Sequence, residues 1–407
     1  MDPTVERTVI RSRQRGFIAA LGVGQIISWG TLYFAFPLLA VPMGAELGYS
    51  RPQLYGLATL ALIVSGLAAY PVGAAIDRGL GRRVMTAGAM LAGLLLLIWS
   101  RLHSLAGLYL VFAGIGLAQA MTLYEPVFAV IVRRFGSDAR RGITAVTLWG
   151  GFASTIAVPV AQALIDAIGW RDTLALLGLC NLLCAVLYLR AINPARDVLP
   201  TATAGSTATT ERAGVLGPLL RRPTFWALLV AFTVFYGAVS ALLLHLYPLL
   251  VERGLEPAMA VALIAAIGPS QVAARVLIMW LAGSRSIRFL GMATASAFPV
   301  AFLLLALPAN PILLWLFAIV FGAANGVMTI VRGLVVPEML TREAYGAVNG
   351  VLAAPSAVAR ALAPVLAAAL WAIAGSYQIF VIVLLLASLV LVGAFGLAVA
   401  TSRPAAD

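Results

Sequence analysis

Apolar stretches long enough to cross a lipid bilayer follow one another along almost the whole chain. A membrane helix needs about 20 mostly apolar residues, and polar clusters, glycines and prolines divide this sequence into twelve such stretches. They lie near residues 16–42, 52–76, 83–101, 105–132, 142–165, 171–191, 223–251, 258–282, 287–307, 311–336, 345–372 and 376–400. The sequence therefore predicts an all-α membrane protein with twelve transmembrane helices.

The composition supports a bilayer as the main solvent. Of the 407 residues 62% are hydrophobic and 10% are charged, whereas soluble domains have about 45–50% apolar and about 25% charged residues. A soluble enzyme, a secreted disulfide scaffold and a disordered chain are therefore excluded. The first stretch is longer than the apolar region of a signal peptide, so we expect it to remain as the first span.

Arginine placement predicts the orientation in the membrane. All 27 basic residues are arginines, and cytoplasmic loops carry an excess of positive charge. With both termini in the cytoplasm, twenty arginines fall in cytoplasmic segments, four outside and three within spans. Because the cytoplasmic arginines sit in short loops, they indicate topology rather than nucleic-acid binding. The short loops and the absence of lysine suggest a prokaryotic inner membrane.

A low-complexity tract, TATAGSTATT at 201–210, separates two halves of six stretches each. We predict six-helix bundles at 1–195 and 222–407, joined by a cytoplasmic linker at 196–221. Three matches relate the halves: Pro37 with Pro248, Glu125 with Arg332, and Pro159 with Pro364, at offsets of 211, 207 and 205. Repeated six-span halves are typical of secondary transporters whose binding site lies at the bilayer midplane.

One loop resembles a known signature. The segment GAAIDRGLGRR after the second stretch is similar to the cytoplasmic loop of the major facilitator superfamily, with one extra residue before the second glycine. The matching residues are Gly73, Asp77, Arg78, Gly81, Arg82 and Arg83. The segments GWR at 169–171 and GPSQVAARV at 268–276 are also similar to this superfamily, the latter to its monocarboxylate and oxalate/formate branches. The resemblance implies alternating access.

Physical chemistry offers two roles for this loop. An acid near a helix end can cap a neighbouring helix and pair with arginine, so Asp77 with Arg78, Arg82 and Arg83 could form a gate on the cytoplasmic side. Alternatively, the arginines only determine topology. We favour the gate, in which Gly73 would also take part, because Asp77 has no use in orientation.

Charges inside the spans are costly and indicate functional sites. Glu125 is the acid deep within a span, and it is either a proton carrier or a structural partner of an arginine. The monocarboxylate resemblance implies that Arg275 binds the substrate anion; the alternative is a structural pair of Arg275 with Glu125 of the other half. In that family an aspartate precedes the arginine by one turn, where this chain has Gln271.

Two further arginines lie within spans. Arg332 matches Glu125 in the repeat, so it is predicted either to form a gate or to extend to the membrane surface. Arg360 either adds positive potential to a cavity or bonds to backbone carbonyls. His245 could titrate near neutral pH, although a lone histidine in an apolar helix is more often a core residue.

Polar side chains complete the predicted site. Gln25, Trp29 and Tyr33 recur every four residues and therefore share one helix face. Further candidates for substrate binding are Tyr124, Gln271 and Asn325. Any of these groups could instead bond between helices.

These features predict a secondary active transporter of a small, monocarboxylate-like organic anion. Glu125 and His245 are the candidates for proton coupling. The alternative is a proton-driven exporter of hydrophobic or cationic compounds. Intramembrane enzymes need a nucleophile with a base or a metal cluster, and the sequence has no such motif, so we expect no enzymatic activity, cofactor or metal. The expected partners are the small-molecule substrate, protons and lipid, with no nucleic acid, and the chain is expected to act as a monomer.

Overall fold

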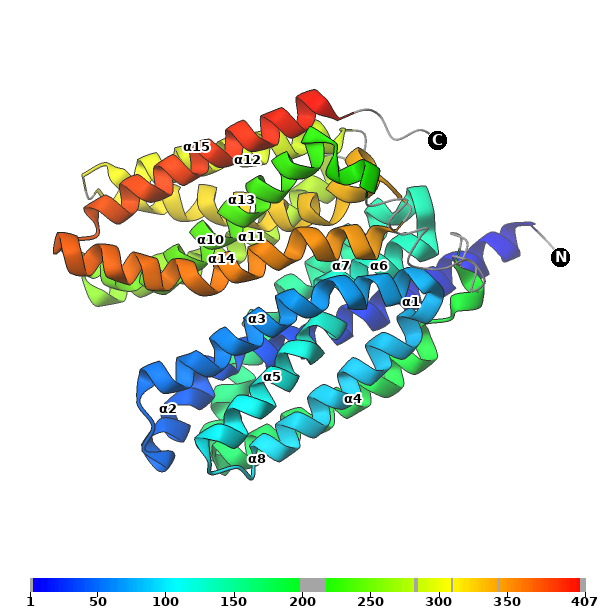
Figure 1. Cartoon of the computed structure of the whole chain (residues 1–407), viewed down its shortest axis with the longest axis horizontal. Coiled ribbons are helices and arrows are strands. Elements are labelled where there is room, and N and C mark those ends of the chain that lie inside the picture. The colour runs from blue at the N-terminus through cyan, green and yellow to red at the C-terminus, as the bar shows by residue number, and fades with distance from the viewer. Residues whose placement is uncertain (1–2, 198–216, 282–284, 309, 343, 403–407) are drawn as a thin grey trace. The chain divides into compact units, whose positions relative to one another are not determined.

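The computed structural model describes residues 3–197, 217–281, 285–308, 310–342 and 344–402. Every regular element within these residues is a helix, which confirms the predicted all-α class. The chain divides into two compact units, Met1–Gly205 and Ser206–Asp407, and each is described by itself (Figure 1). Most of the predicted linker, residues 198–216, lies outside the described residues.

The helices follow the predicted apolar stretches. The first unit contains α1 (Pro3–Trp29), η1 (Gly30–Phe34), α2 (Phe36–Leu47), α3 (Arg51–Ala75), η2 (Ile76–Leu80), α4 (Gly81–Trp99), α5 (Leu105–Thr122), α6 (Tyr124–Phe135), η3 (Gly136–Asp138), α7 (Ala139–Gly151), α8 (Ala153–Ala191) and η4 (Pro194–Arg196). The second contains α10 (Pro223–Glu252), α11 (Pro257–Leu281), α12 (Ile287–Ala306), α13 (Pro311–Val335), η5 (Val336–Leu340), α14 (Tyr345–Ala374) and α15 (Gln378–Thr401).

Nine helical runs of the described residues are long and apolar enough to cross a membrane, and Ala262–Ile278 is a shorter apolar helix. Two of the nine, Gln53–Trp99 and Ala139–Ala191, contain 47 and 53 residues, more than twice the length that one crossing requires. A glycine in the left-handed region interrupts each of them, Gly79 with φ 81° and Gly169 with φ 78°. Each run is therefore long enough to cross the bilayer twice.

Aromatic side chains pack among the aliphatic residues in the core of each unit. In the first unit the ring of Phe36 packs 5.4 Å from that of Phe112, which lies 4.7 Å from Trp99. In the second unit Phe317 and Phe321 stack at 5.7 Å, and Phe298 packs edge-on against Phe321.

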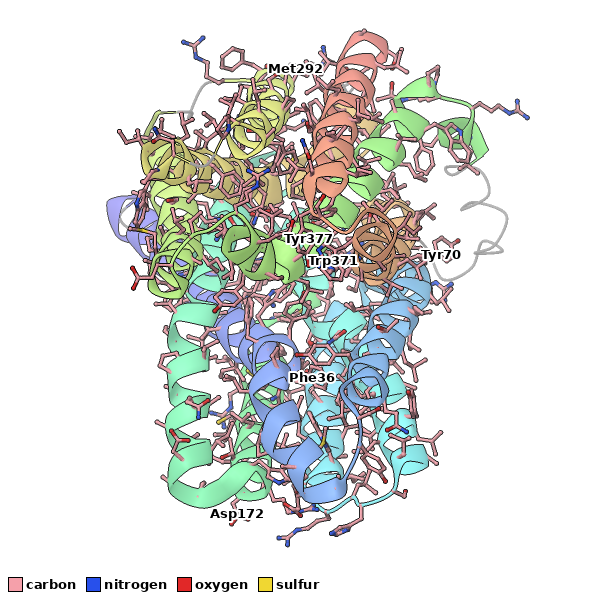
Figure 2. All side chains as sticks on the ribbon, turned by 90° about the vertical axis from the view of Figure 1, so that its left-hand side faces the viewer. Phe36, Tyr70, Asp172, Met292, Trp371 and Tyr377 are labelled. Carbon is pink, nitrogen blue, oxygen red and sulfur yellow. The ribbon has the colours of Figure 1, made fainter. Side chains whose placement is uncertain are left out.

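Large apolar side chains also cover the outside of the molecule (Figure 2). Leu110 is 76% exposed and Ile373 is 86% exposed. Apolar groups inside and outside together are what a protein needs when lipid is its solvent.

Close helix packing repeats between the units. A Cβ at Gly116 on α5 would overlap the carbonyl oxygen of Ala61 on α3, and a Cβ at Gly322 on α13 would lie 2.7 Å from that of Ile267 on α11. Both pairs are separated by 206 positions. The other contacts follow the same scheme, since α4 packs on α8 as α12 does on α15, and α1 packs on α7 and α8 as α10 does on α14 and α15. The packing therefore supports the internal repeat inferred from the sequence.

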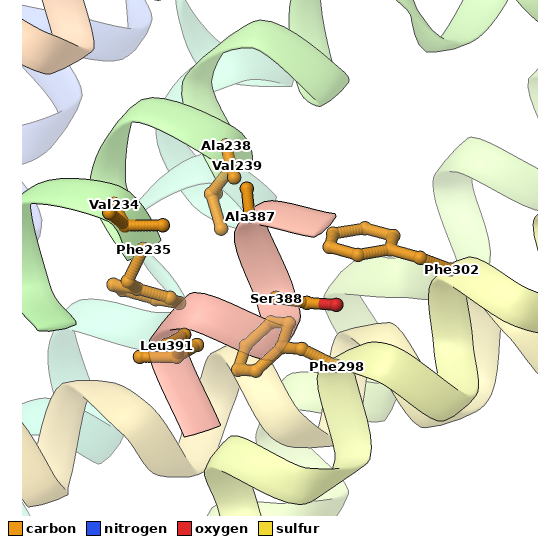
Figure 3. Close-up of a pocket in the computed structure, with 9 residues that line it drawn as sticks. All are labelled: Val234, Phe235, Ala238, Val239, Phe298, Phe302, Ala387, Ser388 and Leu391. Atoms are coloured by element: carbon orange, nitrogen blue, oxygen red, sulfur yellow. The ribbon is translucent and has the colours of Figure 1, made fainter. Parts of the chain in front are cut away.

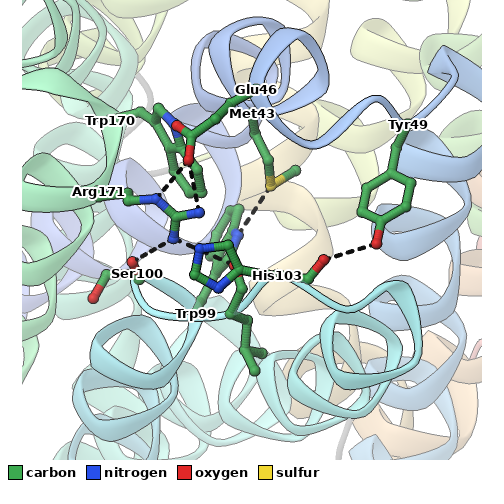
Figure 4. A network of polar contacts seen from close by, with 9 residues as sticks. Met43, Glu46, Tyr49, Trp99, Ser100, His103, Trp170 and Arg171 are labelled. Carbon is green, nitrogen blue, oxygen red and sulfur yellow. Dashed lines mark hydrogen bonds and ion pairs between the residues drawn. The ribbon is translucent and has the colours of Figure 1, made fainter.

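A carboxylate ties helix ends together in the first unit (Figure 4). Glu46, at the end of α2, accepts hydrogen bonds from Trp170 Nε1 at 2.6 Å and from Arg171 Nε at 3.0 Å. These two donors hold the pKa of Glu46 below its usual range. Arg171 also donates to the carbonyl of Ser100 at 2.8 Å, so one cluster connects α2, α4 and the second half of α8.

The second unit has a corresponding cluster at the matching position. Glu252 at the end of α10 accepts bonds from Trp371 Nε1 and from the backbone amide of Tyr377, both at 2.7 Å. Trp371 and Tyr377 lie close together, with ring centroids 6.1 Å apart (Figure 2). Glu46 with Glu252, and Arg171 with Tyr377, are again 206 positions apart. The same link is thus made with an arginine in one unit and a backbone amide in the other.

We predict that Gly116→Val destabilises the protein far more than Gly393→Val. The Cβ at position 116 meets a backbone carbonyl that cannot rotate away, whereas position 393 on α15 has no neighbour within 4 Å. Overpacking of this kind costs about 1–3 kcal/mol or more. Thermal unfolding of the purified variants in detergent measures the difference. Equal melting temperatures would show that α3 and α5 are not packed as described.

Candidate functional site

The fourth apolar stretch is not a continuous helix. Helix α5 ends at Thr122 and α6 begins at Tyr124, within the single candidate span Leu105–Phe135. Leu123 between them is extended, with φ −77° and ψ −158°. Pro126 has no N–H, so the carbonyl of Thr122, four residues earlier, cannot receive its helical hydrogen bond. Proline chemistry therefore explains the break.

The break places Glu125 in the first turn of α6. The carboxylate is half-buried, and it lies at the positive end of the helix dipole, which favours negative charge. Among the described residues of its unit it forms no hydrogen bond and no ion pair. Glu125 is thus held by backbone position rather than by a side-chain partner within that unit.

Aromatic rings gather around this break. The ring of Trp29 lies 5.4 Å from that of Tyr33 and 5.1 Å from that of Tyr124. Tyr124 stacks on Phe128 at 5.2 Å with an interplanar angle of 14°. All but Phe128 are half-buried. The predicted stripe on the first span and the predicted Tyr124 therefore belong to one cluster, the aromatic cluster of the first unit.

Gln25 and Gln119 bond to backbone carbonyls. The fully buried Gln25 donates from Nε2 to the carbonyl of Thr122 at 2.7 Å. This is the carbonyl that Pro126 leaves without an amide donor. Gln119 Nε2 donates to the carbonyl of Leu32 at 2.8 Å. Leu32 lies in the π-helical turn η1, in which a carbonyl bonds to the amide five residues later. For Leu32 that residue is Pro37, which also lacks an amide hydrogen. Sequence reasoning identified Gln25 but not this use of its amide.

In the second unit, Arg275 is buried between α11 and α13. It is 4% exposed, and its Nε donates to the carbonyl of Gly326 at 3.0 Å. Its Nη2 lies 3.2 Å from Thr329 Oγ1 and 3.5 Å from Gln271 Oε1. Two of the predicted substrate-binding residues, Arg275 and Gln271, therefore lie together, with Thr329 as a neighbour that the sequence did not reveal.

Arg332 is also buried, at 4% exposure. Its Nη1 donates to Asn349 Oδ1, and its Nη2 donates to the backbone carbonyl of Asn349 at 3.2 Å. The guanidinium also lies 5.0 Å from the ring centroid of Phe232. Within its unit, Arg332 is thus paired with Asn349. It does not extend to the surface, which was one of its two expected roles.

Arg360 stacks on an aromatic ring. Its guanidinium lies 4.4 Å from the ring centroid of Tyr236, a distance typical of a cation–π contact. Its own carbonyl, four residues before Pro364, accepts a hydrogen bond from Ser240 Oγ at 2.7 Å. The proline-freed carbonyl is thus that of Arg360 itself, and among the described residues of its unit the Arg360 side chain bonds to no such carbonyl.

His245 has both ring nitrogens engaged. Nε2 lies 3.0 Å from the carbonyl of Pro364, and Nδ1 lies 3.0 Å from the hydroxyl of Tyr377. A carbonyl only accepts, so Nε2 carries the hydrogen of the bond to Pro364. This arrangement favours a structural role. Asn325, by contrast, is half-buried and makes no hydrogen bond among the described residues of its unit.

The signature loop forms a π-helical turn, η2, in which Gly79 supplies the left-handed conformation. Gly73 and Asp77 are buried, Arg82 is half-buried, and Arg78 and Arg83 are exposed. Gly81 lies against α6, since a Cβ at this position would be 2.8 Å from Cγ2 of Val130.

Arg133 is a residue of this region that sequence reasoning counted only as a topology charge. It donates from Nη1 to the carbonyl of Asp77 at 2.6 Å and pairs through Nε with Asp197 at 3.1 Å. Burial raises the pKa of Asp197, although Arg133 opposes this shift. No pattern in the sequence distinguishes Arg133 from the neighbouring Arg134, so only the fold reveals it.

A small pocket in the second unit lies between α10, α12 and α15 (Figure 3). Phe235, Phe298, Phe302 and Leu391 contribute to its lining, and the hydroxyl of Ser388 is bonded to its own helix at Leu385. None of the predicted site residues lines it. Its walls are mainly apolar.

Comparison with known proteins identifies the family. The Major Facilitator Superfamily model matches residues 21–364, so the chain belongs to this superfamily of membrane transporters. It is therefore a multi-pass membrane protein, and its superfamily consists of transporters that bind small molecules and not of enzymes.

Individual relatives place the chain near the monocarboxylate branch. Monocarboxylate transporter 11 of Homo sapiens is 30% identical over 279 residues, which cover 65% of this chain and 54% of that protein. Monocarboxylate transporter 13 of Rattus norvegicus is 27% identical over 334 residues, covering 80% and 73%. The chain thus spans about half the length of the human relative.

Solved structures share the fold. The human organic anion transporter MFSD10 (TETRAN) has a TM-score of 0.73 at 17% identity, with 95% of this chain and 99% of that chain covered. The transporter FucP in the outward conformation has a TM-score of 0.68 at 17% identity, with 94% and 98% covered.

We predict that Asn349→Leu lowers the stability of the protein because it leaves Arg332 buried without its side-chain acceptor. Loss of a partner for a buried polar group costs about 1–3 kcal/mol, and more for a charged one. Asn325→Leu is the matched control, since Asn325 makes no hydrogen bond among the described residues of its unit. Thermal unfolding compares the two variants. If Asn325→Leu proves the more damaging, the pairing of Arg332 with Asn349 is not important for stability.

Proposed function

We propose that this protein is a proton-coupled secondary transporter of a small, monocarboxylate-like organic anion. The observation that carries the proposal is Arg275, a guanidinium buried on α11 within the short apolar helix Ala262–Ile278. A charge at this depth costs about 2.5–3.5 kcal/mol on insertion scales, and a planar guanidinium can bind a carboxylate through two parallel hydrogen bonds. The names of the curated relatives support the same substrate class.

The proposed architecture follows from the spans and the repeat. Twelve helices form two six-helix bundles, 1–195 and 222–407, joined by a cytoplasmic linker at 196–221. The protein works as a monomer in an inner membrane, with both termini in the cytoplasm. Transport follows by alternating access, and Asp77 and the loop arginines, together with Arg133 and Arg332, control opening.

In this mechanism the two kinds of charge have different tasks. Arg275 binds the substrate carboxylate, and Gln271, Thr329 and Asn325 add hydrogen bonds around it. Glu125 takes up and releases the coupled proton. The half-buried carboxylate lies at a helix N-terminus with no side-chain partner among the described residues of its unit, so a proton can reach it without first breaking an ion pair there.

Export of hydrophobic or cationic compounds is the second candidate. The aromatic cluster of the first unit favours it, because Trp29, Tyr33 and Tyr124 gather at the helix break whose following turn carries Glu125. The faces of aromatic rings attract cations. Resistance to hydrophobic cations that depends on Glu125, with no carboxylate transport, would support export over the anion transporter.

We predict that Arg275→Gln reduces kcat/KM for uptake of short monocarboxylates into proteoliposomes at least tenfold. Arg275→Lys should recover part of the activity, because lysine keeps the charge but cannot form two parallel bonds to the carboxylate. Arg288→Gln, at the start of α12, is the control for loss of one positive charge. Undiminished carboxylate uptake by Arg275→Gln, from correctly folded protein, would remove Arg275 from the substrate site.

We predict that Glu125→Gln abolishes accumulation driven by a proton gradient while substrate counterflow stays within twofold of wild type. Glutamine has the shape of the protonated acid but cannot release a proton, and counterflow requires no net proton movement. Glu256→Gln, before α11, is the control. Retained gradient-driven accumulation in Glu125→Gln would show that protons are carried elsewhere or not at all.

A further inference from the structure

The helix break that carries Glu125 depends on a side chain from another helix. Pro126 leaves the carbonyl of Thr122 without an amide donor inside a candidate membrane span. Gln25, 97 positions earlier on α1, supplies the missing donor at 2.7 Å. Its side chain has no exposed surface. This single hydrogen bond therefore replaces the one that proline removes.

The orientation of the Gln25 amide follows from its partners. The carbonyl of Thr122 can only accept, so it faces the NH₂ group. The indole Nε1 of Trp29 can only donate, and it lies 3.2 Å from Gln25 Oε1. Both ends of the amide are thus used, and Trp29 connects Gln25 to the aromatic cluster. A carboxylate or an apolar group at position 25 could not satisfy both neighbours.

The second unit shows what the same helices do without this pair. A Cβ at Gly30 would lie against the Cβ of Ala157, and a Cβ at Gly237 would lie 3.6 Å from the Cβ of Ala363. Ala157 and Ala363 are related by the same offset of 206 positions as the packing pairs above, so we take Gly30 and Gly237 as equivalent. Five residues before each glycine stand Gln25 and Phe232. Likewise, when Glu125 is aligned with Arg332, the residue that follows, Pro126, is aligned with Gly333.

The corresponding helix in the second unit, α13, is continuous from Pro311 to Val335. Where proline is absent, the break and the capping glutamine are absent too. The comparison within one chain indicates that Gln25 serves the break rather than general packing of the first helix.

We propose that Gln25 is a positioning residue for Glu125. By capping Thr122 it stabilises the extended conformation of Leu123 and so keeps Glu125 in the first turn of α6. This inference rests on the proposed role of Glu125 in proton coupling. Gln25 itself does not carry the proton or touch the substrate carboxylate in this role.

A double-mutant cycle tests the bond independently of transport. Gln25→Leu leaves a buried carbonyl unpaired and should lower the melting temperature. In Pro126→Ala the restored amide can donate to Thr122, so Gln25→Leu should cost at most half as much in that background. Gln119→Leu, which removes the donor to Leu32, is the control and should cost the same with either residue at 126.

The cycle also decides the case in which Gln25→Leu does not fold. Recovery of folded protein in the Gln25→Leu, Pro126→Ala double variant would support the inference. A double variant that stays unfolded, or an equal loss of melting temperature in both backgrounds, would overturn it and leave Gln25 as a packing residue.

Transport then tests the link to Glu125. Folded Gln25→Leu should lose gradient-driven accumulation at least tenfold and keep counterflow within twofold, as Glu125→Gln does, while Gln119→Leu should reduce both equally. If Glu125→Gln shows this pattern and Gln25→Leu does not, the positioning role is wrong. If Glu125→Gln itself keeps gradient-driven accumulation, the proposed coupling role fails, and the stability cycle still reports on the Gln25–Thr122 bond.

Discussion

Every backbone amide and carbonyl inside a bilayer must find a partner within the protein, since the hydrocarbon core contains no water to bond to. Proline makes this constraint visible, because each proline in a span removes one donor. In the first unit Gln25 replaces the donor that Pro126 lacks. In the second unit Ser240 does the same for Pro364, by donating to the carbonyl of Arg360 at 2.7 Å.

The two units are alike in backbone packing and different in chemistry. Glycines at 116 and 322 bring equivalent helices together, and Glu46 and Glu252 tie equivalent helix ends. The polar interior does not follow this symmetry. The first unit has a carboxylate with an aromatic cluster, whereas the second has the buried guanidinium groups of Arg275 and Arg332. The repeated scaffold therefore carries a different kind of interior charge in each unit.

Much of this arrangement could be predicted from the sequence, and the reasons differ by residue. Span positions follow from length and hydropathy, and the four-residue spacing of Gln25, Trp29 and Tyr33 correctly placed them on one face. The break before Pro126 has a local cause, the missing amide hydrogen of proline, which can be read from the sequence. The partners cannot, because the pairing of Gln25 with Thr122 and of Arg133 with Asp77 joins residues 97 and 56 positions apart. Local patterns contain no information about such tertiary contacts.

Arg275 and Glu125 differ in their hydrogen-bond partners, and this difference bears on which of them can couple transport to protons. Arg275 bonds to a backbone carbonyl and lies near two side-chain oxygens, and a guanidinium does not lose its proton in a protein. Its charge is therefore constant, and only its partners can change. Glu125 has no such bonds among the described residues of its unit, and its charge can be removed by one proton. On the proposed mechanism the arginine supplies a fixed attraction for the anion, and the carboxylate supplies the variable charge. The bond from Gln25 then matters because it fixes where that variable charge lies.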